Sequence, residues 1–284
     1  MSKARFAFLC GALLLCLTAA QSALGQAAAR PAPAATPADL HANVTEPLVD
    51  SSIPDDEAVD KMLTAYSPKV RALDQPIGKL KGDLRKGGVG AGSLGNFVTD
   101  GMRAQSSLKL GKPILLAVTN GGGLRKNVIA EGGLTFRDIF ELLPFENALV
   151  AFDLTGAQVL DLLRVALSHR DAQSGARVKY KINSDKQLEL EGATFLVEGV
   201  ERQIDPAANY TIICIDYLLN VTGGDYAAVL KQASKTQPIG VTTRDAITEY
   251  VKAETAAGRD IKSTLDGRFL FDKAASGGAE EPTR

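Results

Sequence analysis

The chain has 284 residues, with 32 basic and 33 acidic side chains and a formal net charge of −1. That balance excludes nucleic-acid binding through overall basicity, so any anion site must be local. Two His and three Cys residues are too few for a zinc finger, a Cys-rich metal cluster or a disulfide scaffold.

The N-terminus, residues 1–25, predicts an export signal. Lys3 and Arg5 give it a positive start, an apolar run follows, and residues 23–25 form a small-residue cleavage site. A membrane anchor is the alternative, but an apolar run of about 15 residues is shorter than the roughly 20 needed to span a bilayer. We therefore expect an exported protein, periplasmic or extracellular, without a membrane span.

The segments that flank the expected domain have the composition of unfolded chain. Residues 26–46 are rich in Ala and Pro and predict an extended linker, in which His41 is a solvated side chain rather than a metal ligand. Residues 274–284 are polar and predict a disordered tail. The expected folded unit is one domain at residues 47–273.

The first segments of this unit have helical periodicity. Residues 55–66 and 93–107 each place apolar side chains on one stripe, and Ser93 is the expected N-cap of the second helix. Residues 113–119 form a short apolar run that ends at Asn120 and three glycines. This pattern is typical of a buried strand that ends in a tight turn.

Helices and strands then alternate to the end of the unit. Thr135 and Asp138 open a helix that stops at Pro144, and Thr155 caps a longer helix after a strand at residues 148–154. Further β-rich segments and a final helix are expected at residues 177–183, 187–190, 194–198, 210–216 and 244–256. This order predicts a mixed α/β fold in which helices cover sheets.

A first polar patch follows the apolar strand. Gly121, Gly122 and Gly123 allow a ligand to approach backbone N–H groups, while Asn120 and Arg125 supply directional hydrogen bonds. A plain tight turn is the alternative interpretation. The patch is neither a P-loop nor a dinucleotide fingerprint.

Two further patches interrupt the apolar pattern. Pro144 fixes a corner that could present Phe145 outward, although a core Phe is the default interpretation. Gly223 and Gly224 precede Asp225, whose carboxylate either accepts hydroxyl hydrogen bonds or closes an Asx turn. If the three patches converge, they suit a nucleoside, which needs a flat apolar face, an amide, a carboxylate and a guanidinium.

Six short motifs occur in a fixed order along the chain: residues 94–103 (LGNFVTDGMR), 119–125 (TNGGGLR), 143–145 (LPF), 154–156 (LTG), 174–178 (SGARV) and 223–225 (GGD). In this order and spacing, the chain resembles the C-terminal domain of the 5′-nucleotidase family. That family includes UDP-sugar hydrolases and 2′,3′-cyclic-nucleotide phosphodiesterases. The resemblance implies a layered α/β/β/α sandwich.

The resemblance also bears on catalysis. In that family an N-terminal metallophosphatase domain holds two metal ions with His, Asp and Asn ligands, whereas only the expected signal and linker precede residue 47 here. His41 and His169, the latter most simply a solvated residue at a helix end, cannot form a two-metal site. We therefore expect no catalytic residue, metal ligand or cofactor in this chain, which alone should not hydrolyse phosphate esters.

The family's C-terminal domain recognises the nucleoside and clamps its base between two aromatic rings. Carried over residue by residue, the resemblance implies that Asn120 contacts the base and Phe145 forms one face of the clamp. It likewise implies that Arg125 contacts the anionic or ribose end and that Asp225 accepts the ribose hydroxyls.

Several positions depart from the family pattern. The second clamp ring falls on Leu219, with Tyr217 two residues earlier and, if this stretch is a strand, on the same face. Gly90 and Ala91 replace an Arg and a Glu, and Glu146 replaces a Gly. The family's GGDGY reads GGDYA in this chain. These changes predict weakened or absent nucleotide binding.

Three hypotheses of different classes follow. In the first, the chain is the substrate-recognition half of a split nucleotidase and docks on a separately encoded metallophosphatase domain, which holds the divalent metals. In the second, it is a stand-alone exported module that binds a nucleoside, a nucleotide or a similar ligand. In the third, it is a scaffold with a vestigial pocket. None of the three requires a nucleic-acid partner.

Overall fold

The computed structural model of this chain describes residues 45–46 and 48–281. The expected export signal and the expected linker up to residue 44 lie outside the described residues, as does the end of the tail from residue 282. The chain divides into two compact units, residues 1–55 and 56–284. In the first unit the described part includes a turn in which the amide of Ile53 bonds to the carbonyl of Asp50 at 3.1 Å.

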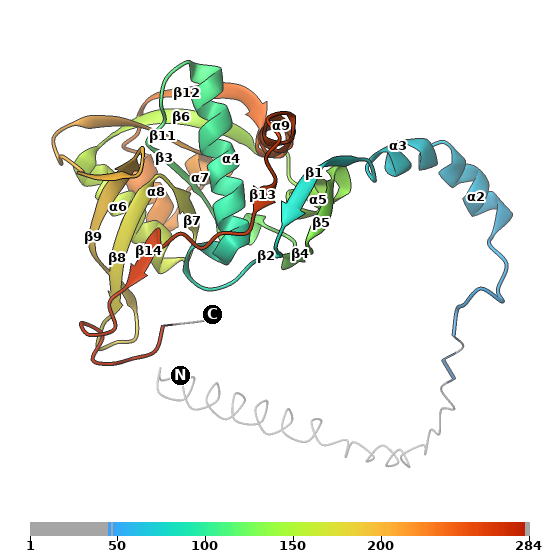
Figure 1. The fold of residues 1–284 in the computed structure, drawn as a ribbon, viewed down its shortest axis with the longest axis horizontal. Coiled ribbons are helices and arrows are strands. Elements are labelled where there is room, and N and C mark those ends of the chain that lie inside the picture. The colour runs from blue at the N-terminus through green and yellow to red at the C-terminus, as the bar shows by residue number, and fades with distance from the viewer. Residues whose placement is uncertain (1–44, 47, 282–284) are drawn as a thin grey trace, which may run out of the picture. The chain divides into compact units, whose positions relative to one another are not determined.

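Helices and strands alternate through the second unit (Figure 1). Its helices are α2 (Glu57–Thr64), α3 (Ser67–Ala72), α4 (Gly92–Leu110), α5 (Phe136–Leu142), α6 (Gly156–Ser168), α7 (Asp216–Asn220), α8 (Gly224–Leu230) and α9 (Thr243–Ala256), with 3₁₀ turns η1 (Val89–Ala91) and η2 (Gly121–Gly123). Its strands are β1 (Pro76–Lys81), β2 (Leu84–Arg85), β3 (Leu116–Thr119), β4 (Val128–Ile129), β5 (Gly132–Thr135), β6 (Ala148–Thr155), β7 (Ala172–Ser174), β8 (Ala176–Ile182), β9 (Leu188–Val197), β10 (Val200–Gln203), β11 (Asn209–Ile215), β12 (Ser234–Thr242), β13 (Ile261–Lys262) and β14 (Phe269–Phe271). The expected mixed α/β class is confirmed.

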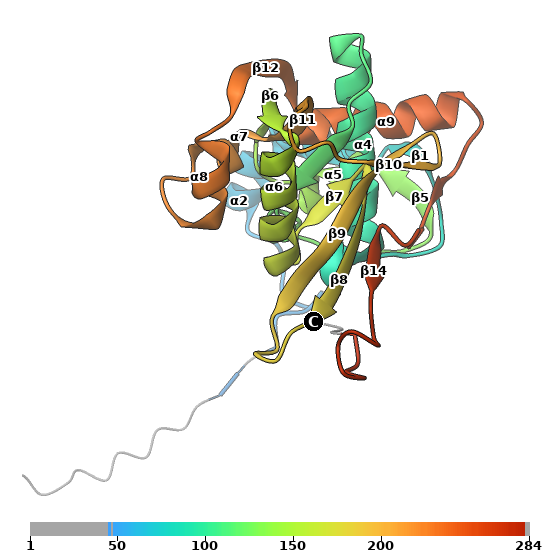
Figure 2. The same cartoon turned by 90° about the vertical axis from the view of Figure 1, so that its left-hand side faces the viewer.

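A five-stranded sheet with the order β12-β6-β11-β3-β7 forms the centre of this unit. Strand β11 pairs antiparallel with β6 and parallel with β3. Helix α4 packs against α9 and against β3 and β7, while α6 contacts α8, β6 and β9 (Figure 2). Every residue of β3 is buried, so the loop that follows it starts from a fixed point.

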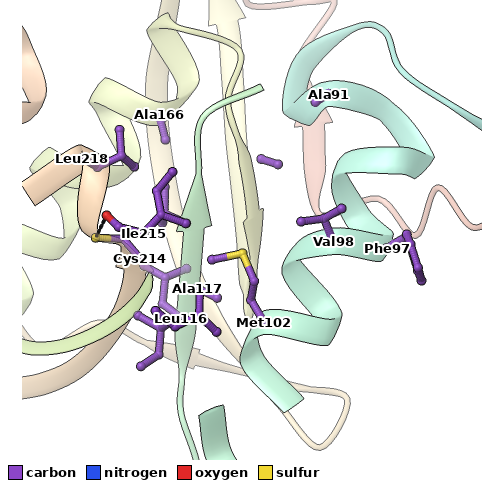
Figure 3. Close-up of a cluster of buried hydrophobic side chains, with 14 of the residues drawn as sticks. Ala91, Phe97, Val98, Met102, Leu116, Ala117, Ala166, Cys214, Ile215 and Leu218 are labelled. Carbon is purple, nitrogen blue, oxygen red and sulfur yellow. Dashed lines mark hydrogen bonds between the residues drawn. The ribbon is translucent and has the colours of Figure 1, made fainter. Parts of the chain in front are cut away.

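The apolar core lies on both sides of β3. Figure 3 shows Val98 and Met102 of α4 on one side of this strand, with Ala166 of α6 and Leu218 of α7 on the other. All four side chains are buried, as is Cys214 of β11. Burial of apolar surface on both faces of a sheet is the main stabilising contribution in this kind of fold.

Two other sheets are completed by the last strands of the chain. They have the orders β10-β9-β8-β14 and β13-β1-β5, in which β14 and β13 pair in parallel with β8 and β1. Arg268 fixes this C-terminal segment against α4. Its guanidinium is buried and donates hydrogen bonds to both carboxylate oxygens of Asp100 at 3.0 Å and to those of Asp266 at 2.7 and 2.9 Å.

Two predicted helix starts are confirmed, because both depend on local hydrogen bonds. Thr135 accepts the amide of Asp138 at 3.2 Å and Asp138 accepts the amide of Thr135 at 3.0 Å, so the two form a capping box. Thr155 and Gln158 form the same motif at the start of α6, with distances of 3.3 and 2.8 Å. Helix α5 ends at Leu142, before Pro144, as expected.

Ser93 is not the N-cap of α4, contrary to the prediction. Gly90, Ala91 and Gly92 have φ values of 79°, 57° and 66°, so the chain turns in the left-handed region and the helix begins at Gly92, with Ala91 at the cap. The hydroxyl of Ser93 instead accepts the amide of Arg85 at 2.9 Å. It therefore ties α4 to β2.

The segments predicted at residues 187–190 and 194–198 are one strand, β9. The residues between these two predicted segments continue the strand and contain a β-bulge at Glu191. Strand β8 pairs Lys179 with Gly192 and Tyr180 with Leu190, so Glu191 is an extra residue in the ladder. Strand β10, which pairs with β9, was not predicted, because all four of its side chains are exposed and three of them are polar.

Helix α2 forms where expected, but its apolar stripe is not buried. Val59, Met62, Leu63 and Tyr66 are between 46% and 61% exposed. Among the residues that the structure describes, none of the helices combines the length and the hydropathy of a membrane span.

The part of the expected disordered tail that the structure describes, residues 274–281, forms turns beside β8. The hydroxyl of Ser276 accepts the amide of Ile182 at 2.9 Å, and Glu281 accepts the hydroxyl of Tyr180 at 2.7 Å.

Candidate ligand-binding site

The loop after β3, residues 120–123, is the centre of the site that the sequence predicts. Gly121, Gly122 and Gly123 form a 3₁₀ turn in which the amide of Gly123 bonds to the carbonyl of Asn120 at 3.1 Å. The predicted tight turn is therefore confirmed. The side-chain oxygen of Asn120 is buried and has no hydrogen-bond partner among the described residues. A Cβ atom at Gly123 would lie 3.3 Å from that oxygen, so glycine leaves room beside it.

Arg125 and Phe145 lie together beside this loop. The amide of Arg125 bonds to the carbonyl of Leu142 at 2.9 Å, which ties the loop to the end of α5. The guanidinium of Arg125 lies 3.4 Å from the carbonyl of Gly122, and its central carbon lies 5.9 Å from the centre of the Phe145 ring. The Phe145 side chain is 49% exposed, so it is presented outward rather than packed in the core.

A small hollow joins Phe145 to the loop. Its walls come from four separate parts of the chain: the end of β3 with its loop, the corner after α5, the end of β11 and the start of α9. It is lined by Thr119, Gly123, Leu124, Leu143, Phe145, Asn147, Ile215 and Thr243. Thus two of the three predicted polar patches meet at this hollow.

The third patch lies at the start of α8 rather than in a turn. Gly223 is the N-cap of this helix, and Gly224 has a φ of 82°, which favours glycine. Asp225 is in the first helical turn, with its side chain 67% exposed. Its carboxylate oxygen Oδ2 lies 3.3 Å from Nε2 of His169, the residue that caps the C-terminus of α6.

Tyr217 and Leu219 do not share a face. The stretch after Ile215, treated as a possible strand, is the short helix α7, in which residues two apart point in different directions. Tyr217 is 55% exposed, whereas Leu219 packs partly against the core. Among the described residues, no ring-to-ring contact links Tyr217 to Phe145.

Asp171 connects the loop to α8, and the sequence patterns did not single it out. Its Oδ1 accepts the amide of Gly121 at 2.7 Å, and its Oδ2 accepts the hydroxyl of Tyr226 at 2.7 Å. Burial raises the pKa of Asp171, although both hydrogen bonds favour the ionised form. The His169 ring stacks on Tyr226 with a centroid separation of 5.7 Å.

A second, more polar pocket of about 380 Å³ lies on the side of the loop that carries Asp171. It is lined by Lys86, Gly87, Gly88, Ala91, Gly121, Gly122, Asn127, His169, Arg170 and Asp171. The ammonium of Lys86 donates to the carbonyl of Leu124 at 2.8 Å, and burial, together with the charge of Arg125, lowers the pKa of Lys86. The loop therefore separates an apolar hollow from a polar one.

Two larger pockets, of about 840 and 510 Å³, lie along the start of α4 and the segment that leads to β14, and contain none of the predicted site residues. Over residues 45–46 and 48–281, no three His, Cys, Asp or Glu side chains are grouped so that they could hold a metal ion.

Comparison with known proteins agrees with the fold. Residues 72–232, more than half of the chain, match the family described as 5′-nucleotidase, C-terminal domain. The chain is 29% identical over 185 residues to the trifunctional nucleotide phosphoesterase protein YfkN of Bacillus subtilis, a match that covers 62% of this chain and 12% of YfkN. It is 28% identical over 183 residues to a 5′-nucleotidase of Vibrio vulnificus, covering 62% of this chain and 31% of that protein.

Among solved structures, the 5′-nucleotidase precursor of Thermus thermophilus is similar with a TM-score of 0.62 and 28% identity, covering 77% of this chain and 44% of that one. The NAD nucleotidase of Haemophilus influenzae shares the fold at a TM-score of 0.58 and 17% identity, covering 76% of this chain and 41% of that one. The chain spans less than half the length of each of these relatives. It belongs to the 5′-nucleotidase C-terminal domain family.

Proposed function

We propose that this chain binds a nucleoside or nucleotide at the loop 120–123 and is the substrate-recognition half of a split nucleotidase in nucleotide catabolism. A separately encoded metallophosphatase domain would supply the divalent metals and the hydrolytic step, since this chain contributes only two His residues. Residues 1–25 have the pattern of an export signal, so the proposed compartment is the periplasm or the extracellular space.

One observation carries the proposal: a buried, unbonded acceptor lies in the same loop region as an exposed aromatic ring and a cation. The side-chain oxygen of Asn120 has no partner among the described residues, and leaving such a group unsatisfied is unfavourable. An N–H donor on a base edge would satisfy it. The exposed Phe145 ring gives the base a stacking face, and Arg125 beside it is available to an anionic group.

The roles proposed for Asp225 and Tyr217 follow from their positions in α8 and α7. Asp225 is exposed at the start of α8, and its carboxylate, although Oδ2 contacts His169, has further lone pairs that can accept two ribose hydroxyls. Gly223 and Gly224 precede it, and a Cβ atom at either position would have no described atom within 4 Å, so the chain is open on that side. Tyr217 is the proposed second stacking face, because it is the exposed aromatic residue of α7, whereas Leu219 packs partly against the core.

The names of the relatives support nucleotide chemistry as the substrate class. YfkN is described as a trifunctional nucleotide phosphoesterase, and the Vibrio and Thermus relatives as 5′-nucleotidases. Each is matched over a minor part of its length.

Isothermal titration calorimetry with the purified chain tests this proposal. Adenosine and AMP are titrated separately, with ribose 5-phosphate and inorganic phosphate as component controls. We expect binding of both nucleoside and nucleotide, with weaker or absent binding of the controls, and a ligand-dependent rise in melting temperature. Absence of binding and of any melting shift with these and with uridine would instead favour a scaffold with a vestigial pocket.

The partner is tested by adding a metallophosphatase domain that lacks its own C-terminal half. Phosphate release from AMP that requires both polypeptides supports the split enzyme. Nucleoside binding without such complementation by the domain encoded beside this chain would favour a stand-alone exported binding module.

A further inference from the structure

Asp171 forms hydrogen bonds with the two parts of the proposed site, the loop 120–123 and helix α8. In each part its partner is the residue that directly follows a proposed ligand-binding residue. Gly121, whose amide donates to Oδ1, comes directly after Asn120. Tyr226, whose hydroxyl donates to Oδ2, comes directly after Asp225. A single carboxylate thus joins the base-contact loop to the helix that carries the ribose-contact carboxylate, with both hydrogen bonds at 2.7 Å.

The carboxylate is itself held in a fixed place. The amide of Asp171 bonds to the carbonyl of Ala166 in α6 at 2.7 Å, and the next residue, Ala172, pairs with Thr119 at the end of β3. Asp171 is only 5% exposed. The backbone of Asp171 is therefore anchored directly before β7, the strand that pairs with the end of β3, and β3 leads into Asn120.

His169, two residues before Asp171, adds further contacts to α8. His169 stacks its ring on Tyr226 and brings Nε2 to 3.3 Å from Oδ2 of Asp225. Tyr226 is buried, so its hydroxyl has few alternatives to the Asp171 carboxylate. The first turn of α8 is consequently located by three contacts with the segment 169–171: the His169–Tyr226 stacking, the His169–Asp225 contact and the Tyr226–Asp171 hydrogen bond.

A buried carboxylate carries a desolvation penalty that an apolar side chain of the same size does not. Among the described residues Asp171 takes part in no salt bridge within 4.0 Å, so its charge is balanced by hydrogen-bond donors rather than by a direct ion pair. Such groups are less favourable than apolar side chains unless they fix a geometry that apolar contacts do not.

We propose that Asp171 is a positioning residue of the nucleoside site, which sets the separation between Asn120 and Asp225 by bridging the loop 120–123 to α8. The proposal rests on the proposed function, because those two side chains matter only if they hold one ligand. Asp171 itself does not touch the ligand. Its effect on binding passes through Gly121 and Tyr226.

The test compares Asp171→Ala, Asp171→Asn and Tyr226→Phe with the unmodified chain. The Asn side chain can accept the Gly121 amide and donate to the Tyr226 hydroxyl, so it keeps both links, whereas Ala removes both and Phe removes one. We expect adenosine to bind about tenfold more weakly to the Ala and Phe variants, a loss of the size that follows when a hydrogen bond no longer fixes a binding group. The Asn variant should keep the unmodified affinity.

A control separates positioning from general loss of stability. Val251 is buried in α9 and contributes to neither the loop nor α8, so Val251→Ala should lower the melting temperature without changing adenosine affinity. Calorimetry is done at a temperature where circular dichroism shows every variant folded. Equal loss of affinity in the Asn and Ala variants, or an equal loss in Val251→Ala, would overturn the proposal.

A second measurement needs no ligand and therefore separates this inference from the proposed function. Amide hydrogen exchange by NMR reports the Gly121 amide directly. In the ligand-free protein we expect Tyr226→Phe, a change on α8, to accelerate exchange at Gly121, and Asp171→Asn to restore protection relative to Asp171→Ala. If the unmodified chain binds no adenosine, the proposed function fails and this exchange result alone decides the link. Unchanged Gly121 exchange in both Tyr226→Phe and Asp171→Ala refutes it.

Discussion

The guanidinium carbon of Arg125 lies 5.9 Å from the centre of the Phe145 ring, and that ring is about half exposed. A cation and an aromatic face are thus held next to each other where the loop after β3 meets the corner after α5. Since Arg125 is also tied by its backbone to Leu142, the pair does not depend on side-chain contact alone. The arrangement suits a planar ligand that also carries a negative charge.

Replacing Phe145 by Ala is expected to weaken adenosine binding by at least tenfold. The reason is the loss of one stacking face, which contributes about 1–3 kcal/mol per base in comparable sites. Calorimetry measures the change. Phe140→Ala is the matched control, because Phe140 is also an exposed ring beside an arginine, with Arg244 4.7 Å from its centre. Equal affinity of the unmodified chain and Phe145→Ala would remove this ring from the site.

Asp225→Asn should reduce the preference for a ligand with ribose hydroxyls. The charged carboxylate accepts hydroxyl hydrogen bonds worth about 1.5–3 kcal/mol, and Asn accepts more weakly. We expect adenosine to bind more tightly than 2′,3′-dideoxyadenosine in the unmodified chain and the difference to shrink in the variant. Asp161→Asn, an exposed carboxylate on α6, serves as the control. A difference that stays the same in Asp225→Asn contradicts the ribose assignment.

The purified chain should release no phosphate from AMP when Mn²⁺, Co²⁺ or Zn²⁺ is added. Ionising a bridging water between two metals requires a cluster of ligands, and the chain has two His residues in all. A colorimetric phosphate assay measures release after each purification step. Activity that remains proportional to this protein through successive steps would show that the chain is catalytic.

Asp171→Asn should raise the free energy of unfolding at neutral pH. Burial raises the pKa of the folded-state carboxylate above its ordinary value of 3.8, and this outweighs the opposing hydrogen bonds and the charges of His169 and Lys86. As the pH rises past 3.8, the unfolded chain loses its proton first, so the ionisable Asp lowers stability over that interval and above it. The Asn variant avoids this loss while it keeps both hydrogen bonds.

Urea unfolding of the two proteins across the acid to neutral range measures this effect. The difference should be absent below the ordinary pKa of the carboxylate, grow as the pH rises, and level off once the folded-state group is ionised. If Asp171→Asn is less stable than the unmodified chain at neutral pH, the negative charge strengthens the two hydrogen bonds by more free energy than burial of that charge costs.

Features set by neighbours in sequence were predictable. The capping boxes at Thr135 and Thr155 depend on residues three positions away, and both helices begin as expected. The turn after β3 is also local. Where the prediction fails, contacts between distant residues are present: the amide of Gly90, next to the left-handed Ala91, bonds to the carbonyl of Arg170 at 3.2 Å, and pairing with β8 makes Glu191 a bulge.

The candidate site could be predicted only in part for the same reason. Asn120, Arg125 and Phe145 belong to short motifs, and Arg125 and Phe145 lie together, whereas α7 places Tyr217 and Leu219 on different faces. Asp171 gave no local signal, because its partners Gly121 and Tyr226 are 50 and 55 residues away. A lone Asp before a short strand has no pattern from which such contacts could be inferred.

Strands β13 and β14 add the final edges to sheets that start with β1 and β8. Near β13, the hydroxyl of Ser263 bonds to the carbonyl of Asp83, 180 residues earlier in the chain. Contacts so remote form slowly, since a large loop must close before any of them is made. Neither sheet can have its full set of strands until synthesis has passed β13 (Ile261–Lys262) and β14 (Phe269–Phe271), so the edges of both sheets are among the last parts of this domain to form.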